Sequence, residues 1–188
     1  MSEAINHNRR SSNGSHRKSQ MGFLLVAGVA MVAGVVVLQT GRADVQSGPA
    51  YVTTIPRGYR DWKLVSVAHE EGNIHSIGAV LGNDIAIKAY REGTLPFPDG
   101  AMIAALHYRH TPSEENDKIF GQPQSFVAGE PTNVQFMVKD SKKYAATGGW
   151  GFGHFQNGKP ADAAFMKPCY PCHSQIKAQD LVFTRYAP

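Results

Sequence analysis

Cysteine is scarce in this sequence: its 188 residues hold only Cys169 and Cys172. A disulfide between two cysteines so close together would close a tiny loop and stabilise little, so a disulfide framework is excluded. Acidic residues are scarce before Asp44: Glu3 is the only one there, whereas five of the 19 basic residues lie in the same segment. Beyond that point 14 residues of each sign remain. The excess of positive charge therefore lies in the N-terminal segment, and the sequence predicts no nucleic-acid partner.

Residues 1–43 have the three parts of an export leader. A polar, basic stretch is followed by an uninterrupted run of 17 apolar or glycine residues at 22–38, and then by polar sequence with the small residues Gly41 and Ala43. The run is longer than an ordinary signal core and shorter than the roughly 20 residues that span a bilayer. A cleaved signal peptide and a retained anchor both remain open. Either one predicts a periplasmic protein that touches the membrane only through this segment.

The rest of the chain is long enough for one domain with its own core. We expect a linker over residues 44–54 and a single domain over residues 55–188. Alternating or short apolar stretches predict strands in the segments 62–67, 75–83, 101–110, 132–140 and 148–155. The predicted fold class is mainly β (α+β): an antiparallel sheet with a few short helices and a C-terminal segment that carries the cysteines.

Three local features complete this prediction. A short helix is expected with Asp84 as its N-cap and Gly93 as its end. The polar segment 111–124 is predicted to be a loop. Glycines alternate with bulky residues in "GGWGFGHF", and glycine within a strand predicts close approach of another backbone or of a bulky ligand.

The two cysteines lie in the sequence "CYPCH", directly before His173. Zinc needs four ligands, and no second ligand pair is present at metal-finger spacing. A thioredoxin-like dithiol belongs at a helix start in an early βαβ unit, which this chain lacks. The pattern CxxCH is typical of covalent haem attachment, in which Cys169 and Cys172 bind the haem and His173 ligates the iron. The sequence predicts one haem c, with a redox dithiol as the alternative.

Only fifteen residues follow His173, and none is Met or His. A second protein ligand to the iron would have to come from upstream. The candidates are Met102, Met137, Met166, His69, His75, His107, His110 and His154. Each also fits an ordinary packing or surface role, and we expect an open sixth position, which favours small-molecule binding over simple electron transfer.

Four stretches resemble cytochrome P-460 in the same order. They are "IPRGYRDWKLV", "PFPDG", "VKDSKKYAATGGWGF" and "CYPCHSQIKAQDLVFTRYAP", and together they cover residues 55–188. The resemblance implies a mainly antiparallel β domain, a homodimer, and one c-type haem whose proximal ligand matches His173. The family includes enzymes that oxidise hydroxylamine or nitric oxide, and it includes the related cytochromes c′-beta, which bind nitric oxide and carbon monoxide.

Two positions depart from the enzymes of this family. Their haem-linked lysine matches Ala105, and their distal carboxylate matches Gln135, which can hydrogen-bond but cannot act as a base. The departures favour the gas-binding branch. Ala105, Gln135 and Phe136 are therefore the candidate distal-pocket residues. Aromatic side chains that also fit core packing are candidates for an apolar distal wall: Phe97, Phe126, Phe136, Trp150 and Phe152.

The sequence thus predicts an exported monohaem cytochrome with an open iron site that binds nitric oxide or a similar small ligand and exchanges electrons. One alternative is an oxidoreductase acting on hydroxylamine, nitric oxide or peroxide. Another is a simple electron carrier. A redox partner protein is compatible with this prediction.

Overall fold

The computed structural model describes residues 51–187. The predicted leader, residues 1–43, lies outside the described residues, as does most of the predicted linker. Among residues 51–187, no helix is both long enough and apolar enough to cross a membrane.

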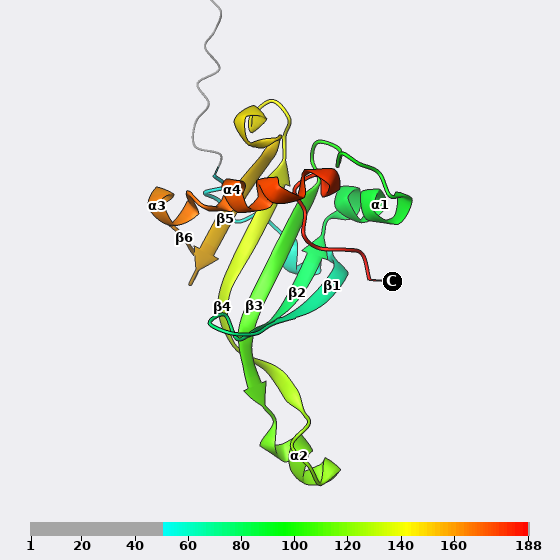
Figure 1. Ribbon diagram of the computed structural model, residues 1–188, viewed down its shortest axis with the longest axis vertical. Coiled ribbons are helices and arrows are strands. Elements are labelled where there is room, and N and C mark those ends of the chain that lie inside the picture. Colours follow the sequence, from blue (N-terminus) through cyan, green and yellow to red (C-terminus); the bar gives the residue numbers. More distant parts are fainter. Residues whose placement is uncertain (1–50, 188) are drawn as a thin grey trace, which may run out of the picture. The chain divides into compact units, whose positions relative to one another are not determined.

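Six strands form one antiparallel sheet in which each strand pairs with its neighbour along the chain (Figure 1). The strands are β1 (Lys63–Glu70), β2 (Ser76–Gly82), β3 (Met102–Pro112), β4 (Phe126–Lys139), β5 (Trp150–Gln156) and β6 (Lys159–Pro160). The α-helices (α) and 3-10 helices (η) are η1 (Tyr59–Asp61), α1 (Asp84–Glu92), α2 (Glu114–Phe120), η2 (Ala145–Thr147), α3 (Ala163–Met166), α4 (Cys169–His173) and η3 (Ser174–Gln179). The mainly β prediction, with short helices and the cysteines near the C-terminus, is confirmed.

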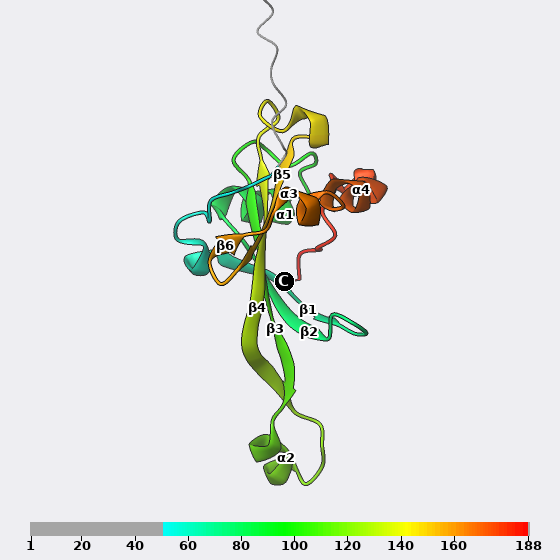
Figure 2. The same ribbon diagram turned by 90° about the vertical axis from the view of Figure 1, so that its left-hand side faces the viewer.

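The sheet packs a hydrophobic core on each face, because successive residues of a strand point to opposite sides. In β3, Ile103 and Ala105 belong to one core, whereas Ala104 and Leu106 belong to the other. Residues of α1, α3 and α4 pack against the first core, and Figure 2 shows α3 and α4 to one side of the sheet. The side of the sheet that carries Ile103 and Ala105 is the helical face. Tyr59 of η1 packs on the opposite face.

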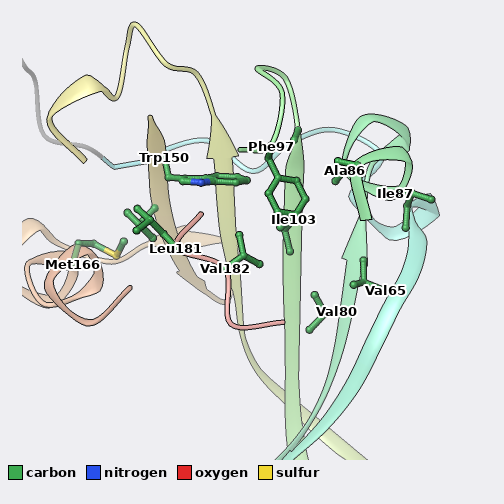
Figure 3. Packing of buried hydrophobic residues seen from close by; sticks show 13 residues of the cluster. Val65, Val80, Ala86, Ile87, Phe97, Ile103, Trp150, Met166, Leu181 and Val182 are labelled. Atoms are coloured by element: carbon green, nitrogen blue, oxygen red, sulfur yellow. The ribbon is translucent and has the colours of Figure 1, made fainter. Parts of the chain in front are cut away.

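The core of the helical face joins segments that are far apart in the sequence (Figure 3). Phe97 precedes β3 and packs edge-on against Trp150 of β5, with ring centroids 5.6 Å apart. Leu181 and Val182, from the tail that follows η3, are buried in the same core. Burial of an aliphatic side chain of this size contributes about 1.5–3 kcal/mol. These contacts hold the C-terminal segment against the sheet.

The helix α1 begins at Asp84, so its N-cap lies one residue earlier than predicted. Asn83, not Asp84, is the N-cap, because its side chain accepts a hydrogen bond from the Ala86 amide at 3.0 Å. The same side-chain oxygen also accepts from the Met102 amide at 3.0 Å, which ties the helix to β3. The predicted end at Gly93 is confirmed, with a φ of 64° in the left-handed region.

The prediction of a loop over residues 111–124 is wrong. This segment ends β3 and then forms the helix α2, at the tip of the β3–β4 hairpin. Ser113 caps the helix by accepting from the Asn116 amide at 3.4 Å, and Gly121 ends it with a φ of 74°. Because α2 buries none of its residues, it has no apolar periodicity, and only the serine and glycine signals could have predicted it.

The glycines of β5 allow close approach of protein atoms and not of a ligand. A Cβ at Gly151 would overlap the Tyr144 ring, and a Cβ at Gly153 would lie 2.8 Å from the Val52 carbonyl oxygen. Both positions alternate with Trp150 and Phe152, so these contacts occur on the side of the sheet away from the helical face.

Candidate functional site

The attachment segment predicted from the sequence forms the short helix α4. Cys169 is half-buried, Cys172 is exposed, and both are free thiols. Burial raises the pKa of the Cys169 thiol, which keeps it protonated at neutral pH. Residues three and four apart in a helix lie on the same side. The helix therefore presents both thiols and His173 within one turn, as covalent haem attachment requires.

The imidazole of His173 has a defined orientation. Its Nδ1 donates a hydrogen bond to the Leu181 carbonyl oxygen at 2.7 Å, and a carbonyl can only accept, so the proton is on Nδ1. The ring packs between Phe152 at 4.8 Å and Phe183 at 5.0 Å, measured between ring centroids. Burial lowers the pKa of His173, so the ring is neutral at pH 7. Its Nε2 keeps a free lone pair, which is the state in which imidazole binds a metal.

The Leu181 carbonyl is directed back toward His173 by a turn after η3. Asp180 and Leu181 both have left-handed backbone conformations, with φ values of 49° and 67°. The Asp180 carboxylate accepts from the Phe97 amide at 2.8 Å and pairs with the buried Lys139 ammonium at 2.8 Å. Sequence reasoning did not identify Lys139 or Asp180 as part of the site. Their only signal was a place inside the stretches "VKDSKKYAATGGWGF" and "CYPCHSQIKAQDLVFTRYAP".

Two of the three predicted distal residues are cross-strand partners. Ala105 of β3 pairs with Gln135 of β4, and Gln135 pairs with His154 of β5. Val80 of β2 is the partner of Ala105 on its other side. Because Ala105 packs against the core of the helical face, the whole row lies on that face, the one against which α4 packs.

Phe136, the third predicted residue, lies on the opposite face of the sheet. It is buried edge-on against Tyr59 at 5.2 Å and Phe155 at 5.6 Å. Adjacent residues of a strand point to opposite sides, so Phe136 cannot share a pocket with Gln135. We therefore remove it from the candidate site.

Polar side chains that sequence reasoning did not combine lie next to this row. His107 follows Ala105 by two residues and so faces the same side of the sheet. Its Nδ1 lies 3.5 Å from the Ser76 hydroxyl and 3.8 Å from the Glu70 carboxylate. Burial, together with the proximity of His107, lowers the pKa of His154. The helical face therefore carries a polar group beside Ala105, and not only the apolar wall that the sequence predicted.

The aromatic wall predicted from the sequence is largely elsewhere. Phe97 and Trp150 fill the core next to α1, and Phe126 is an exposed residue stacked on His110 at 4.1 Å. Among the five candidates, only Phe152 packs against His173. The reason is positional, because strand alternation and the length of the β3–β4 hairpin send these side chains to different surfaces.

The upstream histidines divide into two groups. The rings of His69, His75 and His110 cluster together, with His69 and His110 centred 4.0 Å apart. His107 and His154 lie on the helical face. Within residues 51–187, no three His, Cys, Asp or Glu side chains are arranged to hold a metal ion. An iron that a macrocycle supports needs only axial ligands from the protein, and His173 meets that requirement.

The residues present fit a haem. Two thiols and a neutral, oriented imidazole lie on one helical turn, and aromatic rings pack on the imidazole. Phe165 and Phe183 flank this region and are 56% and 53% exposed, although both are apolar. A large apolar macrocycle attached to α4 would shield such surface from water.

The model of the family Cytochrome P460 matches residues 56–184. None of the curated proteins searched is a significant match to the sequence.

Proposed function

Because this chain belongs to the cytochrome P460 family and is thus a haem cytochrome, we propose that it carries one haem c and binds nitric oxide or a similar small ligand at the iron. Cys169 and Cys172 attach the haem, and His173 binds the iron through Nε2. When bound, the haem supplies an iron that accepts a ligand and exchanges one electron. The Leu181 carbonyl holds the imidazole in its binding orientation, and Phe152 and Phe183 exclude water from the ring.

The observation that carries ligand binding is the position of Ala105. It lies on the helical face between Val80 and Gln135, and its methyl group occupies the place where related enzymes have the lysine. A methyl group forms no bond to the macrocycle and is much smaller than a lysine side chain. The neighbouring Gln135 amide donates to Asn133 at 3.3 Å and is positioned to hydrogen-bond a small ligand without taking its proton.

The test is an absorption spectrum of the ferric and ferrous holoprotein before and after addition of nitric oxide. Ordinary high-spin ferrous bands that shift with the gas support the proposal. A strongly red-shifted ferrous Soret band would indicate a modified macrocycle despite Ala105. Sharp low-spin bands that do not change on addition of nitric oxide would indicate a second protein ligand to the iron, as in an electron carrier. The proposal would then be wrong.

A second candidate function is oxidation of hydroxylamine or a related substrate. The polar group formed by Glu70, Ser76 and His107 favours it, because such oxidations release protons that need an acceptor. The two functions differ in turnover. A binding protein saturates at one ligand per haem, whereas an enzyme consumes substrate in excess of haem when an electron acceptor is present.

We also propose that the chain is exported to the periplasm and acts as a homodimer with a redox partner. The basic and apolar segments before residue 44 support export. Intact mass spectrometry of the protein from its membrane and soluble fractions distinguishes a cleaved signal from a retained anchor. Sedimentation of the holoprotein measures its oligomeric state.

A further inference from the structure

Glu70, Ser76 and His107 form a hydrogen-bonded chain across three strands of the helical face. The Ser76 hydroxyl donates to the Glu70 carboxylate at 3.3 Å, so its oxygen can accept from His107 Nδ1 at 3.5 Å. The carboxylate also lies 3.8 Å from the same nitrogen. Both partners of Nδ1 are acceptors in this arrangement, which places the imidazole proton on Nδ1. The other ring nitrogen, Nε2, is left with its lone pair.

The chain lies beside the proposed ligand site. His107 and Ala105 are two residues apart on β3, and the cross-strand partner of His107 is Asn133, two residues from Gln135. On β2, the cross-strand partner of His107 is Gly78. Because glycine has no side chain, no Cβ from this position contacts the imidazole. Diagonal neighbours in a sheet are about 7–8 Å apart, within reach of long side chains. His107 and Gln135 are therefore neighbours on one surface.

The environment of His107 keeps its imidazole neutral at pH 7. Its side chain is 13% exposed. Burial lowers its pKa, and the Glu70 carboxylate partly offsets this effect, so the ring is neutral at pH 7. An anion arriving nearby raises the pKa of an imidazole, because opposite charges favour its protonated form.

We infer that His107, oriented by Glu70 through Ser76, takes the proton of a weak-acid ligand that binds at the iron as its anion. This inference rests on the proposed haem site and adds a ligand class to nitric oxide: small neutral acids of the form H–A. In the step, the H–A bond breaks, its electron pair stays on A, and the proton forms an N–H bond at His107 Nε2. No electron is transferred. The negative charge of the bound anion and the positive charge of the imidazolium offset each other.

The charged and titratable groups that face His107 come from three strands. The Glu70 carboxylate of β1 lies 3.8 Å from its Nδ1, and His154 of β5 is near enough for the two imidazoles to affect each other's titration. Arg109 of β3 is the cross-strand partner of Ser76, so it lies on the same face of the sheet as His107. Ser76 and Asn133 are neutral. Glu70 is the negative group among these, so it is the one that stabilises the imidazolium.

The test measures protons released when the ferric holoprotein binds cyanide, added at a pH where free hydrogen cyanide is protonated. In weakly buffered solution a pH indicator reports the proton count per haem. We expect the wild-type protein to release close to none, because His107 retains the proton. His107→Gln should release about one proton per haem, and Glu70→Gln should give an intermediate count. His110→Gln, on the same strand but stacked against His69, is the matched control and should behave as wild type.

A count of one proton in both the wild type and His107→Gln would overturn the inference and leave the proposed function intact. Failure of the holoprotein to bind either cyanide or nitric oxide would overturn both. The tautomer provides a check that needs no substitution. Nitrogen-15 shifts of His107 in the diamagnetic ferrous carbon monoxide form should place the proton on Nδ1, and a proton on Nε2 would contradict the inference.

Discussion

Lys139 and Asp180 form a buried ion pair across 41 residues of sequence, with the Lys139 ammonium 2.8 Å from both carboxylate oxygens. The two side chains are only 6% and 12% exposed. The ammonium also donates to the Gly148 carbonyl and lies 4.9 Å from the centre of the Trp150 ring. Asp180 directly precedes Leu181, whose carbonyl orients His173. The pair therefore connects the end of β4 to the residue that positions the proposed iron ligand.

Removing one member of this pair should destabilise the protein strongly. Asp180→Asn leaves a buried ammonium without a counter-ion, at a cost of about 3–5 kcal/mol in the free energy of unfolding. Asparagine tolerates the left-handed backbone at this position, so the effect reports the lost charge. Urea unfolding of the holoprotein measures it. The double variant Lys139→Met with Asp180→Asn should recover part of the loss, and no recovery would mean that charge pairing is not the cause.

The two thiols should each account for one haem bond. Cys169→Ser or Cys172→Ser should leave haem attached through one thioether, and the double variant should release it in denaturing solvent. Mass spectrometry of the denatured protein measures attachment. Tyr170→Phe, between the two cysteines, is the control and should retain both bonds. Retention of covalent haem by the double variant would contradict the attachment proposed for this segment.

Gly151→Ala should destabilise the fold. Its new Cβ would overlap the ring of Tyr144, which is 4% exposed and cannot move into solvent without losing its packing. Overpacking of this kind costs about 1–3 kcal/mol. Gly78→Ala is the matched control in another strand, because its nearest non-neighbour atom would be 3.5 Å from the new Cβ, an ordinary contact. Equal unfolding midpoints for the two variants would contradict this account.

The stability of the fold should fall in mild acid in part because of His154. Burial, followed by the proximity of His107, lowers its pKa below the 6.5 of the free side chain. The unfolded chain then binds more protons than the folded one as the pH falls. The contribution is complete above pH 6.5 and is lost as the pH falls through the lowered pKa of the folded state. His154→Gln should flatten this part of the stability profile, measured by urea unfolding between pH 7 and 5.

Gln156→Asn, on the same strand as His154, provides the comparison for that experiment. It neither adds nor removes a titratable group, so it should leave the slope of stability against pH unchanged between pH 7 and 5. If His154→Gln left the slope unchanged as well, the acid sensitivity would belong to other groups.

Several elements were predictable because their signals are local. The strand alternation of residues 132–140 predicted that Phe136 and Gln135 point to opposite sides, and the structure places them in that way. The same alternation excluded Phe136 from a pocket with Gln135, although the sequence analysis had grouped the two. The helix α2 was missed because a helix that buries none of its residues has no apolar face to reveal it.

By itself, the sequence determined the class of fold and predicted the chemistry of haem attachment. Two cysteines and a histidine within five residues predict covalent haem, since this spacing alone brings them onto one helical turn, and period-two alternation predicts a sheet. Only the tertiary structure decided what surrounds that chemistry. The bond from His173 to Leu181, the pair of Lys139 with Asp180, and the chain from Glu70 to His107 join residues brought together by a backbone reversal or by strand register. Such contacts depend on the folded path of the chain, which no short stretch of sequence contains.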